Sequence, residues 1–359
     1  MSQLHPGKTH LLDFDSDHLG ETISENAQKS FRKSQIRKWV FEDRAQSFAD
    51  MLNVPASFRE ILASRYEIWT STLEKHTKST DGTEKLLLKW PDGGLVECVL
   101  LRDGIRRSIC VSSQVGCAMG CVFCASGLDG VDRNLTSGEI LEQMLRLQHL
   151  LPNTERISHI VMMGMGEPLA NLKNVLSCLS QASARDGLGI SPRRITISTV
   201  GIPESINQLS RLETRYNLAV SLHAPNDTLR NQLVPVNQNI GIRKILAAAD
   251  QYFQISGRRL TLEYVLLAGI NDKAEHANEL AKLLATRAVL LNVIPYNPVA
   301  GLPYKTPSTN TITTFRKILE NAGVTIQFRQ KKGDKINAAC GQLRKMSMQP
   351  KISISNPKP

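Results

Sequence analysis

Three cysteines on one short segment are the strongest chemical signal in the sequence. Cys117, Cys121 and Cys124 lie in GCAMGCVFCASG, with C-x3-C-x2-C spacing, directly after a predicted strand. Three thiolates that converge from one loop can bind a soft metal or an iron–sulfur cluster. Three protein ligands on a 4Fe-4S cluster leave one iron open to a substrate or cofactor. The spacing therefore predicts a cluster with a reactive iron.

Two other interpretations of this segment stay open. A structural zinc site normally has four protein ligands, and Cys110 is the candidate for the fourth. A thioredoxin-like pair formed by Cys121 and Cys124 would leave Cys117 without a role.

A further cysteine lies far away, near the end of the chain. Cys340 stands in DKINAACGQLRK, where Asp334 is the only nearby acid. The neighbouring cations favour a nucleophilic thiolate and also a phosphate backbone close by. They are Arg329, Lys331, Lys332, Lys335, Arg344 and Lys345. Cys98 and Cys178 have apolar neighbours and are expected in the core.

The composition bounds the class of protein. The 359 residues carry 44 Lys and Arg against 33 Asp and Glu, a net charge of +11, and 41% are hydrophobic. This excludes a disordered or fibrous chain and favours a polyanionic partner. No apolar run reaches the roughly 18–20 residues that span a bilayer, and no signal-peptide core is visible. We therefore expect a soluble, cytoplasmic protein whose seven cysteines form no disulfide framework, and in which any cysteine cluster serves metal binding or thiol chemistry.

The first 80 residues have a mostly helical pattern. A helix predicted over 29–40 places Ile36, Trp39 and Val40 on one side. Three cations also follow one another at a spacing of four residues: Lys29, Lys33 and Arg37. Stacked like charges destabilise a helix unless an anion lies opposite. The stripe is either a solvated face or a contact for a polyanion, and we predict an RNA-binding accessory domain over 1–80.

From Lys85 onward the pattern changes to strands that alternate with amphipathic helices. One helix is predicted over 138–150, where Thr136 and Glu139 have capping-box spacing. About six strand–helix units predict an α/β fold, a partial TIM-like barrel over 81–345, followed by a disordered tail over 346–359. Polar residues cluster where strands end, as barrel enzymes require. These segments are HIVMMGMGEP, ITISTVG, LAVSLHAP and VIPYNP.

The cysteine loop in this βα context resembles the radical S-adenosylmethionine (radical SAM) superfamily. The resemblance implies a partial (βα)6 barrel of radical SAM type, one 4Fe-4S cluster, and S-adenosylmethionine (SAM) cleaved to a 5′-deoxyadenosyl radical. Gly166 and Glu167 resemble the segment that meets the SAM amino group, although Glu167 before Pro168 could equally begin a helix. The remaining SAM contacts of the family match Ser198, Ser221, Leu222, His223 and Asn297.

A closer resemblance covers about residues 20 to 345. The segments FRKSQIRKW, RNLT, MGMGEPLAN and AACGQL together resemble the RlmN/Cfr family of RNA methyltransferases. The resemblance implies that Cys340 takes a methyl group from one SAM and that a radical from a second SAM activates it for addition to adenine. Cys110 would then resolve the adduct through a transient disulfide with Cys340. Glu97 would accept a proton, although strand alternation could also make it an outward-facing residue.

The family resemblance also implies the substrate. RlmN-type members methylate carbon 2 of an adenosine in 23S rRNA, and some also modify adenosine 37 of tRNAs. Pro168 after Glu167 is RlmN-like, while Cfr-like methylation of carbon 8 is the alternative. Lys335 and Asn337 depart from the Asp residues that members usually carry there. An electron donor such as flavodoxin and a monomeric state are further expectations.

Two alternatives belong to other functional classes. One is a non-catalytic RNA-binding protein with a structural zinc or iron–sulfur site. The other is a radical SAM enzyme that acts on a protein or a small molecule. The AACGQL segment around Cys340 argues against both.

Overall fold

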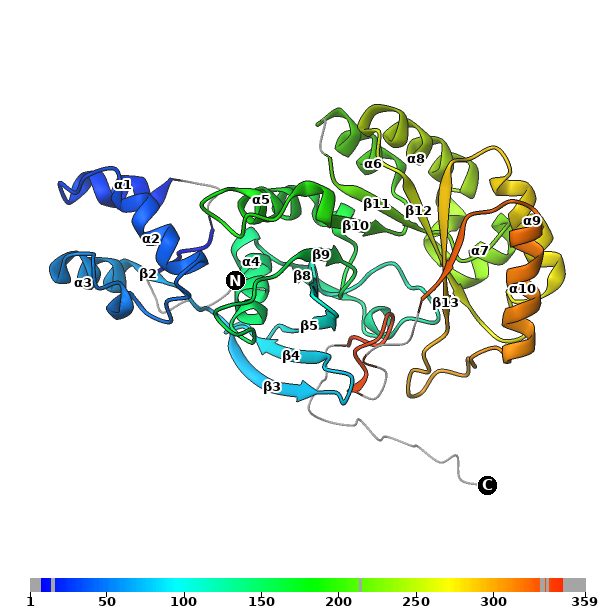
Figure 1. The fold of residues 1–359 in the computed structure, drawn as a ribbon, viewed down its shortest axis with the longest axis horizontal. Coiled ribbons are helices and arrows are strands. Elements are labelled where there is room, and N and C mark those ends of the chain that lie inside the picture. Colours follow the sequence, from blue (N-terminus) through cyan, green and yellow to red (C-terminus); the bar gives the residue numbers. More distant parts are fainter. Residues whose placement is uncertain (1–7, 14–16, 213–214, 330–332, 334–335, 345–359) are drawn as a thin grey trace, which may run out of the picture.

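The chain forms an elongated molecule with a helical N-terminal end and a curved sheet covered by helices (Figure 1). The structure is a computed structural model that describes residues 8–13, 17–212, 215–329, 333 and 336–344. The tail expected over 346–359 lies outside the described residues, as does Lys335.

One sheet of ten strands organises most of the described chain, in the order β14-β13-β12-β11-β10-β9-β6-β5-β4-β3. From β3 to β6 the neighbours are antiparallel, and from β6 to β14 they are parallel. The strands are β3 (Thr72–Lys78), β4 (Glu84–Lys89), β5 (Leu95–Asp103), β6 (Arg106–Cys110), β9 (His159–Met162), β10 (Ile195–Thr199), β11 (Asn217–Ser221), β12 (Leu260–Leu266), β13 (Val289–Pro295) and β14 (Ile326–Phe328).

Helices connect the parallel strands and cover the outer face of the sheet. They are α4 (Ser137–Gln148), α5 (Leu172–Ser183), α6 (Pro203–Arg211), α7 (Asp227–Leu233), α8 (Ile242–Ser256), α9 (Ala274–Leu284) and α10 (Thr309–Asn321). Six parallel strands, β6 and β9 to β13, are each followed by one of these helices, with α7 and α8 both after β11. The predicted partial barrel of six units is confirmed. Among the described helices, each is too short or too polar to cross a bilayer.

Local sequence explains these elements well. Thr136 accepts a hydrogen bond from the Glu139 amide, and the Glu139 carboxylate accepts one from the Thr136 amide, so the predicted capping box begins α4. Along β10, Ile195 and Ile197 are fully buried beneath the helices. Thr196 between them lines a cavity inside the sheet. This two-residue alternation gives the barrel an apolar outer layer and a partly polar interior.

The N-terminal region is a small helical unit joined to the barrel. It contains β1 (Thr9–His10), α1 (His18–Glu25), α2 (Arg32–Phe41), α3 (Ala56–Arg65) and β2 (Tyr66–Glu67), with β1 and β2 paired in parallel. The helical unit ends before the predicted boundary at residue 80. The strand β3, which lies before that boundary, already belongs to the main sheet. Six of the seven β3 residues are exposed, as befits an edge strand that needs no apolar face. Because β3 is polar, the hydrophobic pattern of the sequence did not predict it as a strand.

The basic stripe of α2 does not form the free cationic face that the spacing suggested. Arg37 is 6% exposed, and its guanidinium donates to both carboxylate oxygens of Asp186, at 2.6 and 3.1 Å. Lys33 pairs with Asp17 at 2.6 Å. Lys29 is exposed and lies before α2, which begins at Arg32 and not at the predicted residue 29. Arg37 therefore fixes the N-terminal unit onto the segment after α5, and neither of the two alternatives for the stripe, a solvated face or a polyanion contact, describes this residue.

A second buried charge strengthens the same junction. Glu142 on α4 is fully buried, and its carboxylate accepts hydrogen bonds from the amides and hydroxyls of Thr70 and Ser71, at 2.6–3.0 Å. Burial alone would raise the pKa of Glu142, but His10, Arg146 and these hydrogen bonds outweigh it and hold the pKa below its usual value. Glu142 thus anchors the segment that leads from α3 into the sheet.

We predict that Glu142→Ala lowers the free energy of unfolding by about 3–5 kcal/mol at pH 7, because the four Thr70 and Ser71 donors and Arg146 Nε lose their acceptor in a dry site. A native carboxyl with a lowered pKa binds protons less readily than the unfolded chain. The difference from the wild type should therefore be complete at neutral pH and shrink as pH falls below the usual value of 4.5. Denaturant unfolding at several pH values measures it. Glu275→Ala, at an exposed pair with Lys273, is the control.

Candidate active site

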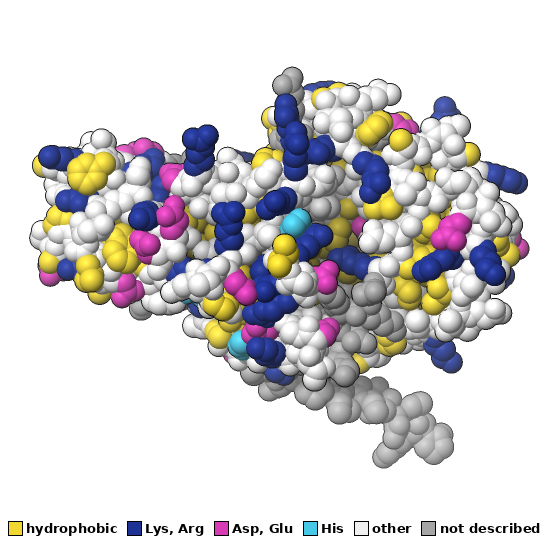
Figure 2. All heavy atoms as spheres, viewed as in Figure 1, with side chains coloured by type: hydrophobic (Ala, Val, Ile, Leu, Met, Phe, Trp, Pro, Cys, Tyr) yellow, Lys and Arg dark blue, Asp and Glu magenta, His cyan; other side chains and the backbone are white. Residues whose placement is uncertain are grey.

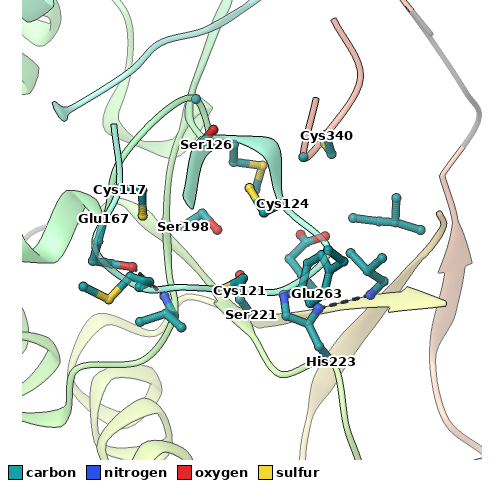
Figure 3. A pocket seen from close by; sticks show the side chains of 18 of the residues that line it. Cys117, Cys121, Cys124, Ser126, Glu167, Ser198, Ser221, His223, Glu263 and Cys340 are labelled. Atoms are coloured by element: carbon teal, nitrogen blue, oxygen red, sulfur yellow. Dashed lines mark hydrogen bonds between the residues drawn. The ribbon is translucent and has the colours of Figure 1, made fainter. Parts of the chain in front are cut away.

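A cavity at the C-terminal ends of the parallel strands gathers most of the predicted site residues (Figure 3). It is bounded by the cysteine loop, by the ends of β9 to β13 and by the C-terminal segment that carries Cys340. The predicted residues in its lining are Cys117, Cys121, Cys124, Gly166, Glu167, Ser198, Ser221, His223, Asn297 and Cys340. Residues that are far apart in the sequence therefore line the same cavity.

The cysteine loop has a firm base. The strands β7 (Gln114–Gly116) and β8 (Val131–Asn134) pair as a hairpin, and the Cys117 amide donates to the Gly130 carbonyl at 2.9 Å. Gly116 has a φ of +81°, and a Cβ there would lie 2.0 Å from the same carbonyl oxygen. Only glycine fits that position. The hairpin therefore directs the three following cysteines into the cavity.

The location of Cys110 separates the two metal interpretations. Cys110 ends β6 and lines a different cavity from the three loop cysteines. The side chains that act on its charge are Cys340 and Arg329 rather than the loop thiols. The fourth ligand that the zinc interpretation requires is thus not beside the loop. Among the described residues, no group of three or more His, Cys, Asp and Glu side chains is gathered tightly enough for a single metal ion.

Glu167 bonds to the neighbouring backbone and also lines the cavity. One carboxylate oxygen accepts from the Leu169 amide at 3.0 Å and caps a short 3-10 helix, Pro168–Asn171. The other accepts from the Val200 amide at 2.7 Å, at the end of β10. Burial raises the pKa of Glu167 to about 6, against the effect of these hydrogen bonds. Its remaining lone pairs suit a cationic ligand group such as an amine.

A buried arginine holds two strand ends in place. Arg230 on α7 is fully buried, and its guanidinium donates to the carbonyls of Val200, Ser221 and Leu222, at 2.6–3.0 Å. Desolvation lowers the pKa of Arg230 to about 10, so the group stays charged at neutral pH. The ends of β10 and β11, which carry Ser198 and Ser221, are therefore cross-linked by one side chain.

His223 is a neutral hydrogen-bonding group. Its Nδ1 accepts from the Val265 amide at 3.1 Å, and its ring lies edge-on to Phe123 at 4.9 Å between centroids. Burial lowers the pKa of His223 to about 3. The proton of the neutral ring must then be on Nε2, because Nδ1 acts as an acceptor.

Asn297 and Leu222 differ in what they offer to a ligand. The Asn297 Oδ1 atom is buried and has no hydrogen-bond partner among the described residues, whereas its Nδ2 donates to the Cys340 carbonyl at 3.4 Å. An orphaned buried acceptor needs a donor from elsewhere. Leu222 is absent from the cavity lining, and its amide and carbonyl bond to Glu263 and Arg230. Leu222 supports the strand end rather than the cavity wall.

Cys340 lies between two cavities. It lines the cavity of the cysteine loop and also a second one of about 740 Å³ inside the barrel, which contains Cys110. Arg329, after β14, donates to the Cys340 sulfur at 3.2 Å. The interaction with the Cys340 side chain is the largest of the effects that raise the pKa of Arg329. This guanidinium therefore stabilises negative charge on the sulfur.

The segment around Cys340 is held against the cysteine loop. The Ala125 amide donates to the Gly341 carbonyl at 2.8 Å, and the Ser126 hydroxyl donates to the Leu343 carbonyl at 2.6 Å. On the other side, Gln342 donates to the Pro298 carbonyl at 3.0 Å. We call residues 336–344 the Cys340 loop.

Glu97 and Cys110 lie outside the first cavity. Glu97 on β5 is 3% exposed and pairs with Lys85 at 2.6 Å, so it is not an outward-facing, solvated residue. Burial raises the pKa of Glu97 despite the opposing charge of Lys85. Burial likewise raises the pKa of Cys110 to about 12, with a further contribution from Cys340. All seven cysteines are free thiols in this structure.

Comparison with known proteins agrees with this architecture. The family model of the radical SAM superfamily matches residues 111–283, and that of the ribosomal RNA large subunit methyltransferase N-terminal domain matches residues 9–68. A probable dual-specificity RNA methyltransferase RlmN of Rhodopirellula baltica is 66% identical over 340 residues, which cover 95% of this chain and 92% of the relative. The chain belongs to the RlmN family of radical SAM RNA methyltransferases.

Other RlmN relatives and a solved structure extend this relationship. A probable dual-specificity RNA methyltransferase RlmN of Carboxydothermus hydrogenoformans is 42% identical over 335 residues, 93% of this chain and 97% of the relative. The crystal structure of a radical SAM methyltransferase from Sphaerobacter thermophilus superposes with a TM-score of 0.90 at 39% identity. It covers 94% of this chain and 99% of the other. The chain is therefore an enzyme that transfers methyl groups.

The residues present fit the cofactors of this family, a 4Fe-4S cluster and SAM. Cys117, Cys121 and Cys124 line the cavity from one loop and would hold the cluster there through their thiolates. The unpartnered Asn297 acceptor and the Glu167 carboxylate are polar groups of the kind that a SAM molecule in this cavity could bond.

Several residues of the site were missed by the sequence analysis. Glu263 is a buried carboxylate that lines both cavities and accepts from Asn292 at 2.7 Å. Its signal was present, since a charged residue within the apolar strand LTLEYVLL requires an explanation. Arg230 and Lys85 lie among ordinary polar residues and gave no such signal.

We predict that Gly166→Ala weakens SAM binding at least about tenfold. Gly166 has a φ of +96°, and a Cβ there would lie 2.6 Å from the Gln114 side chain, which itself accepts from the Glu167 amide. Equilibrium dialysis of SAM with reconstituted protein measures the loss. Gly269→Ala is the control, since Gly269 has a φ of +74° and nothing within 4 Å. Equal losses in both variants would show that backbone strain alone, and not the clash, is responsible.

Proposed function

We propose that this enzyme methylates carbon 2 of an adenosine in 23S rRNA through an S-methylcysteine on Cys340. The observation that carries the proposal is that Cys340 lines both the cavity of the cysteine loop and the cavity of Cys110. A sulfur in that position can take a methyl group on one side and deliver it to a base on the other. When bound, the cluster and SAM supply the methyl group and the one-electron chemistry, with two SAM used per turnover.

Arg329 prepares Cys340 as a nucleophile. Methyl transfer to sulfur requires negative charge on the sulfur, and Arg329 is the cation that donates to it. Arg329 is partly buried, so water screens its charge less than at the open surface. The polar lining of the cofactor cavity, with Glu167, Ser198, Ser221, His223 and Asn297, binds and orients SAM.

Glu97 and Cys110 complete the reaction. Glu97 accepts the proton that leaves carbon 2, and its raised pKa makes it a better base than an exposed glutamate. The Cys110 thiol loses its proton and attacks the Cys340 sulfur. An S–S bond forms, the bond between that sulfur and the methylene carbon breaks, and the electron pair left on the carbon takes up a proton to give the methylated base. Its raised pKa keeps Cys110 protonated until that step.

The choice of carbon 2 and of RNA rests on chemistry and charge. Carbon 2 of adenine is not nucleophilic, so polar methyl transfer would fail there, whereas a carbon radical can add. The net charge is +11, and Figure 2 shows Lys and Arg side chains spread over this face, several of them near its middle, with acidic side chains among them. We also propose tRNA as a second substrate, a flavodoxin-like electron donor, a cytoplasmic location and a monomeric enzyme. Methylation of carbon 8 is the alternative.

Mass spectrometry of 23S rRNA fragments tests the proposed reaction. After incubation with reconstituted enzyme, SAM and a reductant, we expect one added methyl group on an adenosine, at carbon 2. The product is assigned by chromatography against 2-methyladenosine and 8-methyladenosine standards. A tRNA incubation run in parallel tests the second substrate. Unmodified RNA, despite a full cluster and reductive cleavage of SAM, would contradict the proposal.

The two distant cysteines should fail at different steps. We predict that Cys340→Ala makes neither methylated RNA nor a protein–RNA adduct, because no sulfur can store the methyl group. Cys110→Ala should methylate Cys340, add to adenine and then stall with RNA bound covalently, since a methyl side chain cannot attack sulfur. On a denaturing gel, a slow, nuclease-sensitive band should appear for Cys110→Ala and be absent from the double variant. Free turnover by Cys110→Ala would make Cys110 a structural thiol.

Release of the adduct should depend on pH through Cys110. Because its thiol pKa lies near 12, the thiolate fraction rises about tenfold per pH unit below that value. We predict that single-turnover decay of the adduct accelerates about tenfold between pH 7 and 8. Quenched-flow gel analysis measures this rate. A rate that levels off near pH 7 would show that another group limits the attack.

A further inference from the structure

One ion pair on the β4–β5 hairpin contacts the Cys340 loop on both sides of the cysteine. Lys85 on β4 and Glu97 on β5 are diagonal neighbours, because Leu87 pairs directly with Glu97 and Lys85 lies two residues before Leu87. Their side chains are 11% and 4% exposed, and Lys85 Nζ lies 2.6 Å from Glu97 Oε1. Both residues thus face the protein interior from one side of the sheet.

The same two side chains bind the loop backbone. Lys85 Nζ donates to the Asn337 carbonyl at 3.0 Å, three residues before Cys340. The Arg344 amide donates to Glu97 Oε2 at 3.0 Å, four residues after Cys340. Glu97 is thereby engaged at both oxygens. Figure 1 shows the orange-red loop next to the hairpin, although more than 200 residues separate them in the sequence.

These contacts differ from those on the opposite side of the loop. Ala125 and Ser126 bond to the carbonyls of Gly341 and Leu343 without involving a charge. The hairpin contacts instead depend on the charges of Lys85 and Glu97, and charge-assisted hydrogen bonds are the stronger kind. Asn337 contributes only its carbonyl here, so the departure of its side chain from the family pattern leaves this contact intact.

We propose that Lys85 is a positioning residue that holds the Cys340 loop beside the cofactor cavity, and that neutralisation of Glu97 loosens this hold. The proposal rests on the proposed function in one respect, the uptake of a proton by Glu97. In that transfer the C–H bond at carbon 2 breaks, an O–H bond forms on Glu97, and the electron pair stays with the adduct.

The reaction requires the Cys340 loop to be held at first and released later. Cys340 must stay near the cofactor while it receives and delivers the methyl group, and it must then meet Cys110. A neutral Glu97 no longer attracts Lys85 and accepts from Arg344 more weakly. Lys75 on β3 is the other cation whose charge acts on Glu97. Proton uptake would therefore release the loop after the new carbon–carbon bond has formed.

Hydrogen–deuterium exchange of the reconstituted full-length enzyme tests the hold directly. We expect Lys85→Met and Glu97→Gln each to raise exchange in peptides that cover residues 336–344 at least about tenfold. Glu97→Gln mimics the protonated carboxyl. Both variants break the Lys85–Glu97 ion pair, although each residue also has its own bond to the loop, so the effect of the double variant should be smaller than the product of the two single effects. Lys89→Met, at an exposed position of the same strand, is the matched control and should match the wild type.

The double variant also guards against loss of folding, since it leaves no buried charge unpaired. Wild-type exchange in Lys85→Met or in the double variant would overturn the proposal, as would multiplied effects of the two single changes. A purely structural role would predict faster exchange throughout β4, β5 and the barrel instead of in the loop.

A chemical measurement links the hold to catalysis. Mass spectrometry of the Cys340 peptide should show at least about tenfold slower S-methylation in Lys85→Met with unchanged SAM affinity, and Lys85→Arg should recover most of the rate. Unchanged S-methylation in Lys85→Met would count against the proposal. If the wild type forms no S-methylcysteine at all, the proposed function fails, while the exchange experiment still decides whether Lys85 holds the loop.

Discussion

The contact between the Cys340 loop and the cysteine loop is the constraint on which the rest of the site depends. Ser126 and Leu343 are 217 residues apart in sequence, yet a hydrogen bond joins them at 2.6 Å. No local preference can produce such a contact. It exists because the barrel brings the end of β14 and the segment after β7 to the same rim, where the loop can close over the cavity.

The rim is stabilised by buried polar groups rather than by packing alone. Arg230 joins the ends of β10 and β11, and Glu167 joins the segment after β9 to the end of β10. Each of these groups was removed from water, so each needs good partners to remain charged. Their hydrogen bonds go mainly to the backbone, which fixes strand ends with little dependence on neighbouring side chains. A rigid rim of this kind suits an enzyme that must position a reactive cofactor.

Two groups of basic residues that the sequence singled out make different contacts in the structure. The cations around Cys340 include Arg329, which does reach the sulfur. The stripe on α2 looked equally basic, but Arg37 finds Asp186, which lies 149 residues away. Spacing along a helix shows which charges share a face, and it does not show what packs against that face. The exposure of a charge is a tertiary property.

The sequence by itself determined the elements and the chemistry that depend on near neighbours. The capping box at Thr136, the alternation within β10, the six strand–helix units and the C-x3-C-x2-C loop all arise from residues a few positions apart. Resemblance to a family added the strand-end residues and the two distant cysteines. Only the tertiary structure decided that β3 joins the sheet, that Glu97 pairs with Lys85, that Glu263 lines both cavities and that Leu222 stays outside them. These outcomes depend on partners brought together by folding, and the stability of a buried charge is decided by those partners and not by its position along the chain.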